Sequence, residues 1–179
     1  MKYIALLRGI NVSGQKKIAM KDLALLFESM QFSGIQTYIQ SGNVLFTSPT
    51  QKEEKLTEKI EQTLAKKFGF EVQVVIRTLN EWEKLSKNHP FLRKEQTGKD
   101  GRYVTLLRDT PDKKALPALT PYCSEGEEFV AAGREIYLSY PAGFGKTKLT
   151  NQIIEKKLGT VATTRNWNTV QAIRNLLSD

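Results

Sequence analysis

The chain opens with Lys2-Tyr3-Ile4-Ala5-Leu6-Leu7-Arg8-Gly9-Ile10-Asn11-Val12, and a near copy of the first half of this stretch returns as Arg102-Tyr103-Val104-Thr105-Leu106-Leu107-Arg108-Asp109. Residues 3–7 are apolar at nearly every position. A half-exposed strand would alternate apolar and polar residues, so this run predicts a central β-strand covered on both faces. Two further landmarks repeat in the same order, and together they predict a chain built from two related halves. These landmarks are Lys66-Lys67-Phe68-Gly69, mirrored by Lys156-Lys157-Leu158-Gly159, and Arg77-Thr78-Leu79-Asn80, mirrored by Arg165-Asn166-Trp167-Asn168.

The first half has the pattern of a βαββαβ unit, the element order of ferredoxin-like folds. Apolar residues at helical spacing predict two helices, and apolar runs bounded by turn residues predict the strands. Ser41-Gly42-Asn43 has the composition of a tight hairpin turn. The elements predicted after the opening strand are helix 20–30, strands 35–40 and 44–47, helix 53–68, strand 72–76 and a short helix over 80–87 with Asn80 as its cap.

The second half repeats this order after a charged, glycine-containing segment, 93–101. That segment lacks apolar periodicity, so it predicts a linker between a first domain, 1–92, and a second domain, 102–179. The predicted fold class is α+β, with two tandem ferredoxin-like halves whose antiparallel sheets have helices packed on them. The elements predicted here are strand 103–107, a short helix 113–119 interrupted by Pro117, a hairpin of 128–132 and 136–140, helix 149–158, strand 161–165 and a last helix capped by Asn168.

Composition limits the classes of function. The 179 residues include 27 Lys and Arg against 19 Asp and Glu, and the formal net charge of +8 favours anionic partners. No window approaches the roughly 18 apolar residues of a membrane span, and the opening lacks a signal peptide, so we expect no membrane association and a cytoplasmic location. One cysteine, Cys123, and one histidine, His89, are too few ligands for zinc, and no metal or cofactor is expected. A Cys-His nucleophile pair is disfavoured against a buried thiol and a helix-end imidazole.

Strand direction sorts the polar loops of the first half. Because consecutive strands of a βαββαβ unit alternate in direction, three connections lie at one end of the sheet. They are the loop after the first strand, the hairpin turn and the loop before the fourth strand. Their polar and cationic side chains predict a hydrogen-bonding pocket for an anionic ligand. The ligand-binding residues predicted there are Arg8, Asn11, Lys17, Ser41 and Asn43.

The second half offers another candidate site. Its glycine-containing loop, 141–148, is predicted to open a helix, and backbone N–H groups at a helix start suit a phosphate. Gly145-Lys146-Thr147 is not a P-loop, because that loop needs another glycine five positions earlier, where this chain has Tyr140, and a parallel strand before it. The ligand-binding residues predicted there are Lys146, Thr147, Arg165, Asn166 and Trp167.

Simpler structural roles compete with these assignments. Arg8 and its counterpart Arg108 are also suited to satisfy carbonyl groups where strands end. Trp167 fits a packing anchor on the last helix better than a stacking platform, and Asn43 suits the left-handed position of a turn. Sheet-face RNA binding is disfavoured, because the strand 44–47 lacks the exposed aromatic pattern of an RNA-recognition motif.

Three stretches resemble the hallmark motifs of the bacterial domain-of-unknown-function 1697 family. They are Leu6-Leu7-Arg8-Gly9-Ile10-Asn11-Val12 followed by Lys17-Ile18-Ala19-Met20, then Gln40-Ser41-Gly42-Asn43-Val44, and Thr163-Thr164-Arg165-Asn166-Trp167-Asn168-Thr169-Val170. The resemblance runs from end to end of the chain and implies an α+β protein of two related halves from the bacterial cytoplasm. It carries no established activity and no catalytic residues, but it marks the regions of Arg8 and Arg165 as signatures.

Three functional hypotheses remain open on the sequence. The first is a protein that binds an anionic ligand, either a phosphorylated small molecule or the nucleic acid backbone. The second is an enzyme acting on a phosphorylated substrate, with arginine and lysine as electrostatic stabilisers and Cys123 or His89 as its only unusual groups. The third is a scaffold whose signature residues hold the two halves together. No catalytic residue is assigned, and the sequence does not define the oligomeric state.

Overall fold

The computed structural model describes residues 1–49, 52–92 and 101–178. The chain forms two compact units, Met1–Trp82 and Glu83–Asp179. The predicted linker, 93–101, lies outside the described residues except for Gly101. None of the described helices combines the length and the apolar character needed to cross a bilayer.

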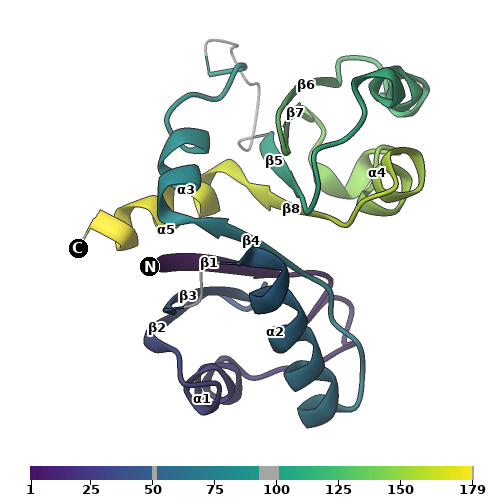
Figure 1. The fold of residues 1–179 in the computed structure, drawn as a ribbon. Coiled ribbons are helices and arrows are strands. Elements are labelled where there is room, and N and C mark those ends of the chain that lie inside the picture. The colour runs from purple at the N-terminus through teal and green to yellow at the C-terminus, as the bar shows by residue number, and fades with distance from the viewer. Residues whose placement is uncertain (50–51, 93–100, 179) are drawn as a thin grey trace. The chain divides into compact units, whose positions relative to one another are not determined.

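The first unit has the predicted βαββαβ order (Figure 1). Its four strands form an antiparallel sheet in the order β2-β3-β1-β4, so β1 is a central strand. The elements are β1 (Lys2–Leu7), α1 (Met20–Ser29), β2 (Ser33–Tyr38), β3 (Asn43–Thr47), α2 (Glu53–Phe68) and β4 (Val74–Thr78).

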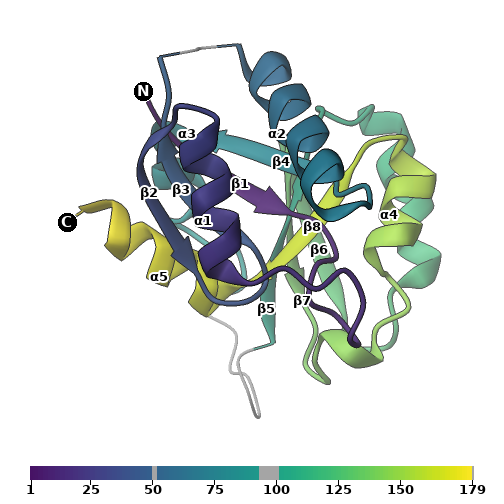
Figure 2. The same ribbon diagram turned by 90° about the horizontal axis from the view of Figure 1, so that it is seen from below.

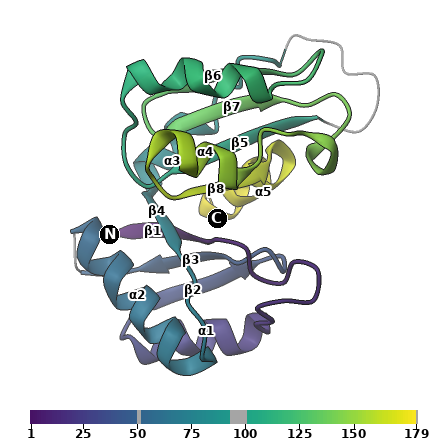
Figure 3. The ribbon, with the colours of Figure 1, turned by 90° about the vertical axis from the view of Figure 1, so that its right-hand side faces the viewer.

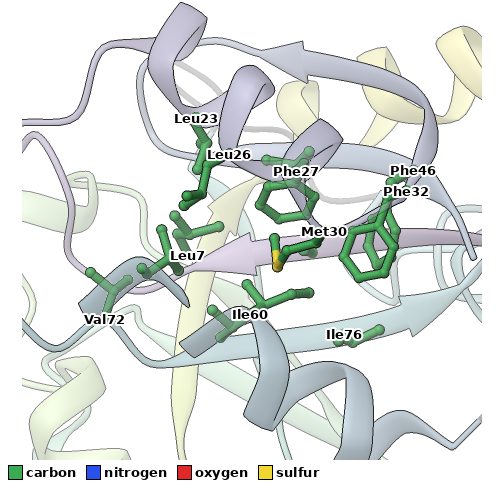
Figure 4. Close-up of a cluster of buried hydrophobic side chains, with 14 of the residues drawn as sticks. Leu7, Leu23, Leu26, Phe27, Met30, Phe32, Phe46, Ile60, Val72 and Ile76 are labelled. Atoms are coloured by element: carbon green, nitrogen blue, oxygen red, sulfur yellow. The ribbon is translucent and has the colours of Figure 1, made fainter. Parts of the chain in front are cut away.

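Helices α1 and α2 cover one face of this sheet. Alternate strand residues such as Leu7 and Ile76 join Phe27 of α1 and Ile60 of α2 in one cluster of buried side chains (Figure 4). This is the arrangement that period-2 strands and period-3.6 helices produce when each buries one apolar face. Ile4, which points to the opposite face of β1, is also fully buried. The predicted burial of both faces of this strand is confirmed.

The second unit contains a sheet of the same order, β6-β7-β5-β8, again antiparallel throughout (Figure 3). The α+β fold class with two four-stranded antiparallel sheets is therefore confirmed. The elements are β5 (Arg102–Leu107), the 3-10 helix η1 (Lys113–Tyr122), β6 (Glu128–Ala132), β7 (Glu135–Ser139), the 3-10 turn η2 (Phe144–Lys146), α4 (Asn151–Leu158), β8 (Ala162–Asn166) and α5 (Trp167–Ser178). Helix α3 (Leu79–Leu85) follows β4, and the division between the two units falls within it.

The strands of the first hairpin, predicted over 35–40 and 44–47, lie over Ser33–Tyr38 and Asn43–Thr47. Strand β2 ends at Tyr38, two residues before the predicted end, because Tyr38 pairs directly with Asn43. Residues 39–42 therefore form the turn, and Ile39 belongs to the turn and not to the strand.

The helix predicted over 113–119 also differs. It is a 3-10 helix that continues past Pro117 and ends at Tyr122. Proline lacks the N–H that an α-helix needs, and the short i to i+3 hydrogen bonds of a 3-10 segment accommodate it here. Asp112 begins the segment by accepting a 2.9 Å hydrogen bond from the backbone N–H of Lys114.

Neither predicted asparagine cap is correct. Before α3, the Oγ1 of Thr78 accepts from the N–H of Glu81 over 3.3 Å, and the Glu81 carboxylate accepts from the N–H of Thr78 over 2.8 Å. This reciprocal pair is a capping box. Before α5, the Oδ1 of Asn166 accepts from the N–H of Asn168 over 2.8 Å. Both helices begin earlier than their apolar periodicity indicates, so Asn80 and Asn168 lie inside the first turn.

Candidate functional site

Three loops of the first unit meet at one end of its sheet, as the strand directions predict. The backbone N–H of Leu7 donates to the oxygen of Gly42 over 2.9 Å, and that of Arg8 donates to Gln73 over 2.9 Å. The first bond ties the end of β1 to the β2–β3 turn, and the second ties the start of the β1–α1 loop to the α2–β4 loop. Figure 2 shows the β1–α1 loop as the long purple segment beyond the end of β1.

Asn11 fixes the β1–α1 loop through its side-chain amide. Its Nδ2 donates to the backbone oxygens of Ile18 over 2.9 Å and Gln40 over 2.8 Å, while its Oδ1 accepts from the N–H of Ile18 over 2.9 Å. Both amide hydrogens are therefore used inside the fold. Asn11, predicted as a ligand contact, gives the loop its shape.

The backbone of this loop is strained. Asn11, Ser13 and Lys16 adopt φ values of 55°, 49° and 46°, a left-handed conformation that residues other than glycine seldom adopt. Two contacts hold it in place. The N–H of Asn11 donates to the oxygen of Lys16 over 3.2 Å, and the Nζ of Lys16 donates to the oxygen of Glu71 over 2.7 Å. Strain that neighbouring contacts maintain is common at binding sites.

The tip of the loop is a small hairpin. Val12 and Gln15 form an isolated antiparallel bridge, and the N–H of Gln15 donates to the oxygen of Val12 over 3.0 Å. Ser13 and Gly14, the two residues between them, both have positive φ, as a hairpin turn of type I′ requires.

An open depression of about 440 Å³ lies beside the β1–α1 loop. Its volume is in the range of sites that hold small molecules. Of the residues predicted to bind a ligand, Asn11 and Lys17 line it, whereas four lining residues were not predicted. The full lining is Asn11, Gly14, Lys17, Ile18, Ala19 and Gln40.

The depression has cationic character. Ala19 is the N-cap of α1 and supplies no side-chain acceptor, so the first N–H groups of the helix have no side-chain cap. The positive end of the helix dipole favours a negative charge there, and the exposed Lys17 adds a full positive charge. Asp22 in the first turn of α1 partly opposes this field.

Ser41 and Asn43 stabilise the β2–β3 turn from within and do not line the depression. Asn43 is fully buried, and its Nδ2 donates to the oxygen of Tyr38 over 2.9 Å and to the Oγ of Ser41 over 3.0 Å. The left-handed residues of the turn are Ile39 and Gly42, so the interpretation of Asn43 as the left-handed residue is wrong.

Gly42 permits the close approach of this turn to the β1–α1 loop. A Cβ at Gly42 would lie 2.5 Å from the Cδ1 of Ile10 and 2.9 Å from the Cβ of Leu7. These distances are shorter than van der Waals contact, so only glycine fits without a shift. Arg8, between Leu7 and the strained loop, is half-buried and also lies outside the depression's lining.

The second predicted site lacks the expected geometry. The loop 141–148 does not open directly into a helix, because α4 begins later and is capped by Thr150. Two of its N–H groups are used internally: that of Gly143 donates to the oxygen of Tyr140 over 2.8 Å, and that of Lys146 donates to the oxygen of Gly143 over 3.2 Å. Lys146 itself is exposed on η2.

Thr147 is a buried structural residue. Its Oγ1 donates to the carboxylate of Glu127 over 2.9 Å and accepts from the N–H of Leu149 over 3.1 Å. The loop is therefore anchored by its own threonine, which leaves Lys146 as its exposed predicted residue.

Arg165 occupies a position that the two halves share. It stands opposite Val104 in the second sheet, as Arg77 stands opposite Ile4 in the first. Both arginines are buried, and the Nη1 of each donates to the backbone oxygen of the preceding residue, over 3.0 Å at Arg165 and 2.8 Å at Arg77. Burial lowers the pKa of the Arg165 guanidinium to about 10.

Trp167 and His89 pack together inside the second unit. Trp167 is 5% exposed, and its ring lies edge-on to that of His89 at a centroid distance of 4.9 Å, which confirms the packing role. The Nδ1 of His89 accepts from the N–H of Phe91 over 3.3 Å, so its Nε2 donates to the oxygen of Tyr103 over 3.0 Å. With both ring nitrogens used and the side chain buried, His89 is not placed as a catalytic base.

Cys123 is partly exposed at the end of η1. Burial, and then the nearby charge of Glu127, raise the pKa of its thiol. The reactive thiolate is therefore disfavoured. Among the described residues, no three His, Cys, Asp or Glu side chains form a group that could hold a metal ion.

Comparison with known proteins places this fold. The structure resembles that of the conserved bacterial protein SP0830 from Streptococcus pneumoniae, with a TM-score of 0.75 over 98% of both chains at 22% sequence identity. No curated protein matches the chain. The family model described as "Protein of unknown function (DUF1697)" matches residues 1–137, which is most of the chain and includes the whole first sheet. The chain therefore belongs to the DUF1697 family.

Proposed function

We propose that this protein binds an anionic small molecule, such as a phosphorylated metabolite, in the depression beside the β1–α1 loop. The observation that carries the proposal is the meeting of exposed Lys17 with the uncapped start of α1 at Ala19, both lining the same depression. A cation and backbone N–H groups at a helix start are the donors that a phosphate needs. The formal net charge of +8 adds a long-range attraction for anions.

The size of the depression favours a small molecule over the nucleic acid backbone. An open depression of about 440 Å³ has room for one ligand of metabolite size. Nucleic acid backbones instead require a basic groove that follows several phosphates. The lining offers one exposed lysine, Lys17, with Gln40 as a neutral hydrogen-bonding side chain.

The residues in and around the depression divide into two roles under this proposal. Lys17, Gly14 and Gln40 contact the ligand, since they line the depression and are exposed. Asn11 and Asn43 act as positioning residues, because their amides hold the loop and the turn around it.

A titration followed by NMR tests the proposal. Inorganic phosphate and pyrophosphate are added at low salt to the isotope-labelled full chain, and we expect amide shifts centred on residues 14–19 and 40. Lys17→Ala should weaken binding about tenfold, as expected for losing a hydrogen bond to a charged group. Lys55→Ala removes the same charge from the exposed face of α2 and is the matched control.

The outcomes separate the hypotheses. If the two lysine variants weaken phosphate binding equally, the binding depends on net charge and not on the depression. An absence of amide shifts around the depression would refute the site. Tighter binding of a single-stranded oligoribonucleotide, with shifts spread beyond the depression, would favour the nucleic acid backbone.

The bacterial cytoplasm is the compartment that we propose for this protein. The motifs of its family, its single cysteine and its formal net charge of +8 fit a reducing compartment rich in phosphorylated metabolites. Fractionation of cells that express a tagged full chain would check this location.

A further inference from the structure

Ile39 has a conformation that the fold itself does not explain. It lies in the β2–β3 turn with a φ of 50° and is 48% exposed. A β-branched residue in the left-handed region is a true outlier, whereas glycine or asparagine would adopt it readily. Its side chain is apolar and faces water, so neither the backbone nor hydrophobic burial favours isoleucine here.

Val12 shows the same exposure on the neighbouring loop. It belongs to the hairpin at the tip of the β1–α1 loop and is 59% exposed, among the most exposed of the large apolar residues in the described part of the chain. A polar residue would serve the hairpin bridge equally well, because that bridge uses only backbone atoms.

Neither residue belongs to the lining of the depression, but each is the chain neighbour of a residue that does. Val12 follows Asn11, and Ile39 precedes Gln40. Asn11 and Gln40 both line the depression and are joined by the 2.8 Å hydrogen bond from Asn11 Nδ2 to the Gln40 oxygen. Two exposed apolar side chains are thus attached to adjoining parts of a wall that also includes Lys17.

We infer that the ligand is an amphipathic anion, an aryl or alkyl phosphate whose apolar body packs against Ile39 and Val12 while its phosphate binds near Lys17. This inference rests on the proposed function and specifies its substrate class. Covering the two side chains removes apolar surface from water, and the site gains a means of distinguishing such a ligand from inorganic phosphate.

The test compares two probes on the same full chain. Phenyl phosphate and inorganic phosphate are titrated by NMR at low salt, and we expect phenyl phosphate to bind about tenfold more tightly, which corresponds to roughly 60 Å² of apolar surface removed from water. Ile39→Asn should lower the affinity for phenyl phosphate several-fold and leave that for inorganic phosphate unchanged. It should also raise the urea midpoint of unfolding, because asparagine tolerates the left-handed backbone.

Val12→Ser should weaken phenyl phosphate binding in the same selective way. Val130→Ser alters an exposed valine of β6 and serves as its control. Equal affinities for the two probes, or an unchanged affinity for phenyl phosphate in both Ile39→Asn and Val12→Ser, would overturn the inference and leave anion binding intact. If neither probe binds, the proposed function itself fails.

Discussion

The side-chain amide of Asn11 donates a 2.8 Å hydrogen bond to the backbone oxygen of Gln40, and this bond joins two loops that are 29 residues apart in the chain. A second bond from the same amide closes the β1–α1 loop on Ile18. The Asn11 side chain therefore holds one edge of the depression, and we expect the loop to be most sensitive to substitution at this position.

Asn11→Ala should destabilise the protein by about 2–3 kcal/mol, since three hydrogen bonds of about 1 kcal/mol each are lost. Urea unfolding followed by circular dichroism measures the loss. Asn11→Gly relieves the left-handed backbone but loses the same bonds, so it should remain well below the parent protein. Asn88→Ala, at an exposed asparagine, should stay within about 0.5 kcal/mol. A stable Asn11→Gly variant would show that backbone conformation, and not the amide, holds the loop.

Gly42→Ala and Gly69→Ala separate backbone strain from steric overlap. Both glycines have nearly the same φ, 74° and 77°, so both variants lose about 1 kcal/mol or more from the left-handed conformation. Only at Gly42 would the new Cβ overlap Ile10 and Leu7, whereas nothing lies within 4 Å at Gly69. Gly42→Ala should therefore cost a further 1–3 kcal/mol, roughly. Equal unfolding midpoints for the two variants would contradict the tight packing of the turn.

Asn166→Ala should destabilise the protein by about 1 kcal/mol or more, because the Asn166 side chain caps the N–H of Asn168 at the start of α5. Asn168→Ala makes the same chemical change two residues later, where the side chain is exposed, and should have little effect. Thermal unfolding of the two variants is the comparison. A larger loss in Asn168→Ala would restore the assignment that the sequence favoured.

The phenol of Tyr137 should make stability fall at alkaline pH. Burial, and then the charge of Glu135, raise its pKa to about 12, whereas an unfolded tyrosine ionises near pH 10, roughly. The unfolded chain then loses its proton first, so this contribution is complete below about pH 10 and is lost as the pH rises towards 12. Tyr137→Phe should flatten this decline in urea unfolding measured between pH 9 and 11.

The same variant has a second expected effect at neutral pH. The hydroxyl of Tyr137 donates to the backbone oxygen of Leu85 over 3.1 Å, so its removal should cost about 1 kcal/mol. A Tyr137→Phe protein with the parent's alkaline decline would show that other groups cause it.

The fold could be predicted from the sequence because its signals are local. The apolar run of β1 and the helical spacing of α2 fix their elements without reference to distant residues, and the repeat around Arg108 shows that the order occurs twice. The first residues of the helices could not be predicted as well from the sequence. Thr78 and Asn166 each cap a helix whose first turn begins before the apolar pattern does.

The candidate site could be predicted only in part. Strand direction identifies which loops meet, and it correctly brings Lys17 and Asn11 to one end. It does not reveal that the amides of Asn11 and Asn43 are consumed by backbone oxygens far along the chain, because those partners depend on the folded turn. Ile39 was hidden for a related reason, since its place in the turn follows from the pairing of β2 with β3.

The closure made by Asn11 also determines where the chain can carry a reporter group. The exposed tip formed by Val12 to Gln15 takes no part in the hydrogen bonds that the Asn11 side chain makes with Ile18. A fluorophore attached to the thiol of Ser13→Cys, with Cys123→Ser removing the native thiol, would leave those bonds unaltered and lie on the loop that lines the depression. Because the tip is exposed and the bonds of Asn11 hold the rest of the loop, the fluorescence of such a label would report ligand binding in solution.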